Sequence, residues 1–282
     1  MYASSRTYRR QATGGRRGRR SCKRLAAVRT LKSTLCRWHR KARYLRGYLD
    51  FDASGNRVRR RTDFANCPRP VLLLYGLFST RRSCEVLEHR LRRDGYGVFS
   101  IDLGGLGGAF NTRGIDESAE LVREKVERLY ARYPLGPLSI IGHSKGGLIG
   151  RYYVERLGGD ARVRTLVTLG TPHQGTPRAY LGCATVGLFA PSVWQMTPRS
   201  TFLRRLNLGP WPNSVDLVSV YSRADACTPY PSGRVELPGA DNVRNVEVPG
   251  LRHRDFLVAA SAYEVVQRAL RDAELPGRLA HG

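Results

Sequence analysis

Short, nearly continuous apolar segments alternate with amphipathic ones through most of the chain, and this alternation limits the possible folds most strongly. The first, residues 71–75 (VLLLY), has the pattern of a strand buried on both faces. Further strands are predicted at 98–103, 138–141, 163–169, 215–221 and 243–248, and helices at 84–93, 117–133, 145–157 and 255–272. Such repetition predicts an α/β fold with a mostly parallel sheet and helices on both faces.

One interval in this pattern is too long for an ordinary connection. More than 40 residues separate the strands at 163–169 and 215–221. We predict that residues 173–212 form a helical cap or lid inserted into the domain. Its apolar side chains can pack together as a small subdomain, line an acyl pocket, or do both. These side chains are Tyr180, Leu181, Val186, Leu188, Phe189, Val193, Trp194 and Met196.

The N-terminal part of the chain is strongly basic. Residues 1–61 hold 20 of the 48 Lys and Arg residues but only two of the 23 acidic residues. We therefore predict an arm, residues 1–62, ahead of a domain at 63–282. The first 20 or so residues are predicted to be disordered, because Arg-, Gly- and Ser-rich sequence cannot form a core.

Within this arm, five apolar residues recur at helical spacing among basic ones: Leu25, Val28, Leu31, Leu35 and Trp38. The pattern predicts a basic amphipathic helix. Such a helix can lie on an anionic membrane, contact phosphates, act as a transit-like leader or pack on its own domain.

Length and composition exclude several classes of protein. A chain of 282 residues with 41% hydrophobic residues can form one large core, and no apolar stretch approaches the roughly 20 residues of a transmembrane helix. No secretory signal is evident, so we expect a cytoplasmic or membrane-peripheral protein. The six cysteines show neither Cys-x-x-Cys pairs nor zinc-finger spacing, so we expect reduced thiols and no metal. No nucleotide-binding motif is complete, and we expect no cofactor.

The motif G-x-S-x-G occurs once, as Gly142-His143-Ser144-Lys145-Gly146. The motif alone is a weak signal, but here an apolar strand leads into it and a helix leads out. This is the setting of a nucleophile elbow, in which a tight turn presents the serine hydroxyl at the carboxyl edge of the sheet. We therefore predict that Ser144 is a nucleophile.

A serine nucleophile requires a histidine base and a carboxylate that orients the histidine. His253 follows the last predicted strand and is the predicted base, whereas His173, in LGTPHQGTP, better suits a turn or a pocket wall. Asp225 lies a few residues beyond the strand at 215–221 and is the predicted acid. The other aspartates considered stand at the wrong edge or open a helix: Asp216, Asp241 and Asp255.

The oxyanion of a tetrahedral intermediate requires N–H donors that are already in place. We predict the backbone N–H of Lys145, next to the nucleophile, and that of Leu77 in the loop after residues 71–75. Phe78 is the neighbouring alternative. The side chain of Lys145 either steers an anionic substrate or is solvated at the surface.

Residues 68–270 resemble the α/β-hydrolase fold, and specifically a bacterial triacylglycerol lipase and esterase family. The segments that carry the resemblance are PVLLLYGLF, GHSKGGLIGRYY, VTLGTPHQGTP and QMTPRSTFLRRLN. It implies a serine esterase or lipase that hydrolyses carboxylic, lipid acyl esters through Ser144, Asp225 and His253. One departure is Tyr75-Gly76, where the family usually has His-Gly.

Three other functions stay open at this stage. An acyltransferase or a thioesterase would use the same triad. Alternatively, the basic arm would bind nucleic acid or an anionic membrane, and of these two partners nucleic acid is the less favoured.

Overall fold

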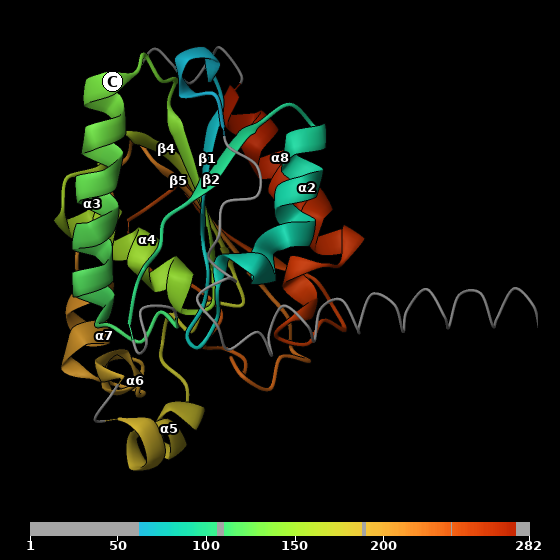
Figure 1. The fold of residues 1–282 in the computed structure, drawn as a ribbon. Helices are drawn as coiled ribbons and strands as arrows, with labels where there is room; N and C mark the ends of the chain where they lie inside the picture. The colour runs from blue at the N-terminus through green and yellow to red at the C-terminus, as the bar shows by residue number, and fades with distance from the viewer. Residues whose placement is uncertain (1–61, 106–109, 188–189, 238, 275–282) are drawn as a thin grey trace, which may run out of the picture. The chain divides into compact units, whose positions relative to one another are not determined.

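The computed structural model describes residues 62–105, 110–187, 190–237 and 239–274 (Figure 1). Residues 1–61 of the predicted arm, with the predicted amphipathic helix, lie outside this range. So do Leu188, Phe189 and the side chain of Val186 in the predicted cap.

Within the described residues, six strands form a single parallel sheet in the order β2-β1-β3-β4-β5-β6. The strands are β1 (Pro70–Leu74), β2 (Gly97–Ser100), β3 (Leu138–His143), β4 (Val163–Leu169), β5 (Asp216–Tyr221) and β6 (Val243–Glu247). Every residue of β1 is buried, as expected for a continuous apolar run between two helical layers. The predicted α/β fold with a mostly parallel sheet is confirmed.

Helices cover both faces of the sheet (Figure 1). On one face lie α3 (Ile115–Arg132) and α4 (Lys145–Arg156), and on the other α2 (Glu85–Arg93) and α8 (Ala260–Glu274). Most residues of α4 are buried, whereas α3 buries one stripe of its surface. In α3 the stripe is Ile115, Ala119, Val122 and Val126, at the three- and four-residue spacing of a helix that packs on one side.

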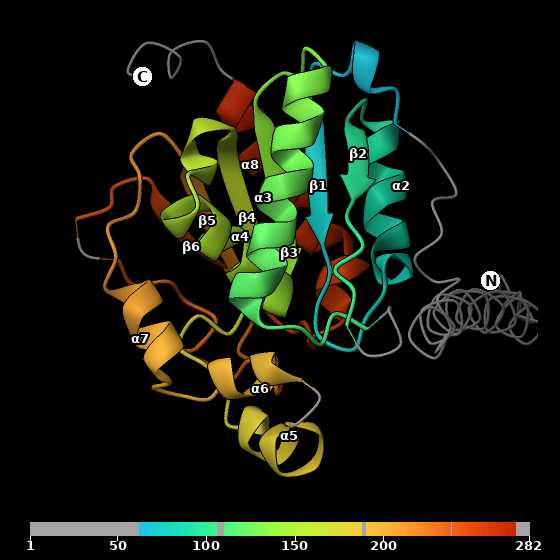
Figure 2. The same cartoon turned by 60° about the vertical axis from the view of Figure 1, so that its left-hand side comes forward.

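Three helices lie between β4 and β5, within the residues predicted as a cap: α5 (Arg178–Val186), α6 (Pro191–Gln195) and α7 (Thr201–Asn207). They lie beyond the carboxyl ends of the strands (Figure 2). The Gln195 side chain ties α6 to the first turn of α3, since its Oε1 accepts from Ile115 N at 2.6 Å and its Nε2 donates to Asp116 Oδ1 at 2.9 Å. None of the helices in the described ranges is long and apolar enough to span a membrane.

Two predicted elements differ from the structure by more than two residues at one end. The strand predicted to continue to residue 103 ends at Ser100. The chain turns at residues 102–104, where Asp102 Oδ1 accepts from Gly104 N at 3.0 Å and Gly104 has a positive φ of 60°. The last predicted helix is divided into a short 3-10 helix, Asp255–Leu257, and α8, which begins at Ala260.

Candidate active site

Ser144 lies in the turn between β3 and α4 with φ 56° and ψ −125°. This left-handed conformation is unfavourable for a residue with a Cβ and costs about 1–3 kcal/mol, so its surroundings must hold it in place. Ser144 N donates to Leu169 O at 2.9 Å, which ties the turn to β4. A strained serine between a buried strand and a helix has the conformation of a nucleophile elbow.

Neighbouring glycines allow this turn to pack against the sheet. A Cβ on Gly142 would lie 2.5 Å from backbone atoms of Gly147, and one on Gly146 would lie 2.2 Å from the Leu74 carbonyl oxygen. Backbone atoms cannot move aside as a flexible side chain does. The glycines of the motif are therefore required by close backbone approach.

Asp225 and His253 lie together, although they follow different strands. The Nδ1–H of His253 donates to Asp225 Oδ2 at 2.8 Å. The other carboxylate oxygen, Oδ1, accepts from the backbone N–H groups of Cys227 at 2.8 Å and Thr228 at 3.0 Å. The Asp225 side chain is 1% exposed and that of His253 14%. The carboxylate is thus fixed by three donors, and it fixes the tautomer in which Nε2 of His253 is the basic nitrogen.

His143, directly before Ser144, holds the backbone of the predicted base. Its Nε2–H donates to the His253 carbonyl oxygen at 2.9 Å, and the two rings lie 4.8 Å apart, centroid to centroid. Burial, with a smaller contribution from the nearby His253, lowers the pKa of His143 to about 3. The ring is therefore neutral near pH 7, and it places His253 beside the residue that precedes Ser144.

The loop after β1, where an oxyanion donor is predicted, packs directly on Ser144. A Cβ on Gly76 would lie 3.1 Å from Ser144 Cβ. Tyr75, at the position where the family usually has histidine, is fully buried, and its hydroxyl accepts from Leu103 N at 3.0 Å. The carbonyl oxygens of Tyr75 and Gly76 accept from Asn111 Nδ2 at 2.7 and 3.2 Å. Asn111 thus holds the loop in place.

The side chain of Lys145 is fully buried, so the expectation of a solvated surface lysine is wrong, and the alternative, that it steers an anionic substrate, stays a prediction. Its Nζ donates to Asn111 O at 2.7 Å, Asn111 Oδ1 at 2.9 Å and Arg113 O at 2.6 Å. Burial lowers the pKa of Lys145 to about 7. Lys145 holds Asn111, which in turn holds the Tyr75-Gly76 loop.

His173 belongs to a buried structural network. Its Nε2 is 3.0 Å from Thr168 Oγ1, and its Nδ1 is 3.2 Å from Arg151 NH1. Arg151 also pairs with Glu155 at 2.8 Å and donates to Asn207 Oδ1 on α7 at 2.9 Å. The network links α4, the loop after β4 and the cap, as expected for a residue in a turn or wall.

The structure therefore brings Asp225 and His253 into direct contact and places Leu77, Ser144 and Lys145 in two segments that pack on each other. Sequence reasoning missed Asn111 and His143. Asn111 has φ 47°, and asparagine is enriched among residues with positive φ, but nothing in the local sequence relates it to Lys145. His143 occupies a variable position of the motif, and its contact with His253 joins residues 110 positions apart.

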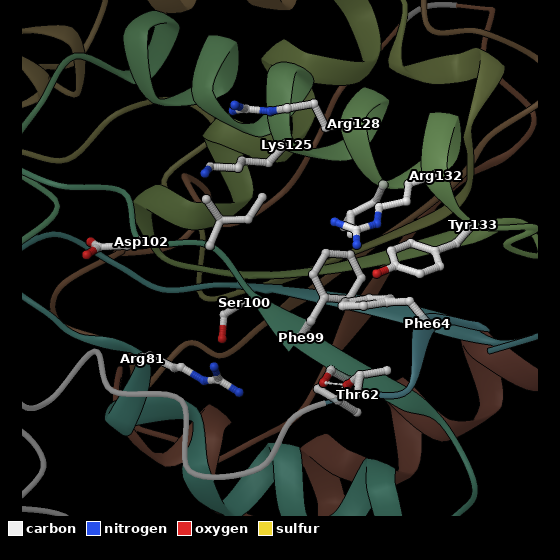
Figure 3. A pocket seen from close by; sticks show the side chains of 13 residues that line it. Thr62, Phe64, Arg81, Phe99, Ser100, Asp102, Lys125, Arg128, Arg132 and Tyr133 are labelled. Atoms are coloured by element: carbon white, nitrogen blue, oxygen red, sulfur yellow. Dashed lines mark hydrogen bonds between the residues drawn. The ribbon is translucent and has the colours of Figure 1, made fainter. Parts of the chain in front are cut away.

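A cavity of about 850 Å³ lies beside the edge strand β2 (Figure 3). Four cationic side chains and one carboxylate are among its lining residues: Arg81, Lys125, Arg128, Arg132 and Asp102. The rings of Phe64 and Phe99, also in its wall, meet edge to face with centroids 5.3 Å apart. None of the predicted catalytic or oxyanion residues lines it, so this β2 groove is separate from the candidate active site.

Comparison with solved structures gives lipases and esterases as similar folds. A mature lipase of Bacillus licheniformis has a TM-score of 0.58 at 14% identity, covering 77% of this chain and 96% of that one. Lipase B of Aspergillus fumigatus has a TM-score of 0.59 at 16% identity, covering 76% and 55%. A monoacylglycerol lipase of Paleococcus ferrophilus has a TM-score of 0.53 at 18% identity, covering 73% and 95%.

Among curated proteins, the chain is similar to a GPI inositol-deacylase of Candida albicans, with 27% identity over 120 residues. The match covers 42% of this chain and spans about a quarter, 24%, of that relative's length. A family model described as the alpha/beta hydrolase fold matches residues 69–225, which is more than half of the chain. The solved structures share the fold of this chain, and the chain belongs to the α/β-hydrolase fold family.

Proposed function

We propose that the protein is a serine hydrolase that cleaves carboxylic esters, with Ser144 as nucleophile, His253 as general base and Asp225 as the orienting acid. The observation that carries the proposal is the 2.8 Å hydrogen bond between His253 Nδ1 and Asp225 Oδ2. This pair follows β5 and β6, and the strained Ser144 follows β3, so all three stand at the carboxyl edge of one parallel sheet.

In the proposed reaction, Ser144 Oγ attacks the ester carbonyl carbon while His253 Nε2 takes the hydroxyl proton. The proton then passes to the leaving alkoxide, which departs as the alcohol, and an acyl-enzyme remains. Water attacks the acyl-enzyme with the same histidine as base, which releases the acid and restores the serine. Asp225, fixed by two backbone donors, stabilises the positive imidazolium in both steps.

The negative oxygen of each tetrahedral intermediate is proposed to accept from the backbone N–H groups of Leu77 and Lys145. Each such donor contributes on the order of 3 kcal/mol to transition-state stabilisation. Support comes from the contact of Gly76 with Ser144 and from the hydrogen bonds of Asn111 to the loop carbonyls. Because the donors are backbone groups, tyrosine in place of histidine at position 75 is compatible with the chemistry.

A fluorophosphonate probe tests the nucleophile directly, because it phosphonylates an activated serine and needs no knowledge of the natural substrate. We expect labelling of the full chain, loss of labelling in Ser144→Ala and retention in Ser100→Ala, a serine in the β2 groove. His253→Ala should also abolish labelling. A folded wild-type protein that takes up no probe would refute the proposal.

The substrate is proposed to be a lipid acyl ester. Three large apolar residues of α5 and α6 are exposed: Tyr180 by 55%, Leu181 by 72% and Trp194 by 57%. By contrast, Val193 and Met196 are buried and hold the cap together. Each methylene of an acyl chain buried against such side chains adds about 0.8 kcal/mol of binding. The names of the neighbours, lipases and a deacylase, agree with this substrate class.

A series of p-nitrophenyl esters of increasing acyl length tests the substrate class. We expect kcat/KM to rise from the acetyl ester to medium-chain esters, because longer chains bury more apolar surface. The double variant Leu181→Ser and Trp194→Ser should lose this rise and keep acetyl ester turnover. A maximum at the acetyl ester in the wild type would contradict a lipid substrate.

A further inference from the structure

The side chain of Cys227 lies beside the Asp225 and His253 pair, and its thiol has no part in the proposed chemistry. One ligand atom from each of Asp225, Cys227 and His253 lies within 4.8 Å of the other two. The Cys227 thiol is free, and Cys227 and His253 are half-buried while Asp225 is buried. A thiolate, an imidazole nitrogen and a carboxylate are the ligand types that Zn²⁺ prefers in proteins.

We propose that Asp225, Cys227 and His253 form an inhibitory binding site for a thiophilic divalent cation such as Zn²⁺ or Cd²⁺. Three protein ligands leave a fourth position open to water from the half-buried side, which is the coordination of an accessible zinc site. The sequence gives no sign of this site, because His253 lies 26 residues from Cys227 and no Cys-x-x-Cys or Cys/His spacing results.

The geometry needs only a small adjustment to accept the ion. Zinc lies about 2.0–2.3 Å from nitrogen, oxygen and sulfur ligands, so the ligand atoms of a tetrahedral site lie roughly 3.2–3.8 Å apart. His253 Nδ1 and Asp225 Oδ2, at 2.8 Å, must separate slightly, and Cys227 Sγ must approach them. Asp225 Oδ1 is already held by the backbone N–H groups of Cys227 and Thr228, so Oδ2 is the oxygen that turns to the cation.

Binding of the cation releases one proton to solvent and moves a second proton from one ring nitrogen of His253 to the other. The thiol of Cys227 loses its proton to solvent when the metal–sulfur bond forms. The proton on His253 Nδ1 is replaced by the metal, and the ring remains neutral by carrying its proton on Nε2. That nitrogen is the proposed acceptor of the Ser144 proton, so a metal-bound His253 cannot act as the base. The inhibition therefore rests on the proposed function, whereas the binding does not.

Absorption by the Cd²⁺–thiolate charge-transfer band measures binding without any assay of activity. The full-length wild type is titrated with Cd²⁺ alongside Cys227→Ser and the matched control Cys183→Ser, at a half-buried free cysteine on α5. We expect Cys227→Ser to lose the band of one thiolate, while Cys183→Ser keeps it. His253→Ala should retain the thiolate but weaken Cd²⁺ binding about tenfold or more. A band unchanged in Cys227→Ser overturns the site.

Inhibition is measured separately, as turnover of a soluble short-chain ester with added Zn²⁺ or Cd²⁺. Each protein is compared with its own turnover without metal. Cys227→Ser should require about tenfold more metal for half-inhibition than the wild type, and a chelator should restore wild-type turnover. Equal sensitivity of wild type and Cys227→Ser overturns the inhibitory role. If no ester is turned over, the proposed function fails, but the thiolate band still decides whether the metal site exists.

Discussion

Stability in mild acid should depend on His143, the buried histidine next to the proposed nucleophile. Its ring is 3% exposed and donates from Nε2 to the His253 carbonyl oxygen at 2.9 Å. Burial lowers its pKa from 6.5 to about 3. In the unfolded chain the same imidazole is solvated and has its ordinary pKa.

The sign and size of the effect follow from proton linkage. Between pH 6.5 and 3 the unfolded chain binds a proton at His143 that the folded protein does not bind. Acid therefore favours unfolding: the contribution of His143 is complete above pH 6.5 and decreases by about 1.4 kcal/mol per pH unit below it. At pH 5 the loss relative to pH 7 is about 2 kcal/mol.

The variant His143→Gln isolates this contribution, because glutamine does not titrate and its amide can still donate to the His253 carbonyl. We expect the free energy of unfolding in urea to fall between pH 7 and pH 5 by about 2 kcal/mol more in the wild type than in the variant. Other groups titrate equally in both proteins, including buried His173, whose pKa is also lowered. If the free energy of unfolding changes with pH equally in the two proteins, the prediction is wrong, and His143 binds its proton equally well in the folded and the unfolded state.

Three further predictions test the frame of the site. Lys145→Met removes three hydrogen bonds that hold Asn111 and Arg113, and should lower kcat on a soluble ester roughly 10- to 100-fold, measured with KM. Gly146→Ala places a Cβ 2.2 Å from the Leu74 carbonyl oxygen and should lower the free energy of unfolding by at least about 2 kcal/mol, measured by thermal unfolding. The control is Gly158→Ala, where no atom lies within 4 Å of the added Cβ and the expected loss is about 1 kcal/mol. Deleting residues 1–61, which hold 20 basic residues, should leave soluble ester turnover unchanged but reduce binding to anionic vesicles at low salt. Loss of soluble-ester turnover on that deletion would instead assign the segment to the catalytic domain.

Residues that follow strands could be predicted from the sequence, because parallel strands bring their carboxyl ends to a common edge. Ser144, Asp225 and His253 each come soon after a predicted strand, and the hydrophobic pattern of the sequence located those strands at 138–141, 215–221 and 243–248. Asp225 and His253, which the structure places in contact, were selected in this way.

The support for the loop after β1 could not be predicted, because it depends on a segment that folds back across the sheet edge. Asn111 contacts Tyr75 and Lys145, which are 36 and 34 residues away in sequence. A lysine beside a nucleophile usually suggests a charged surface. Only the tertiary arrangement of three carbonyl-type oxygens around its Nζ shows why this one is buried.

The β2 groove has a consequence for how copies of this protein meet. β2 is an edge strand of the described sheet, and open sheet edges are places where chains of different molecules join into fibres. Here Thr62 and Arg92 already donate to the Val98 carbonyl oxygen, and four cationic side chains but one carboxylate are among the residues that line the groove alongside. Two copies that approach through this edge bring like charges together, a repulsion that acts over about 10 Å at 0.1 M ionic strength. This repulsion disfavours pairing of two copies through β2, and most strongly at low ionic strength.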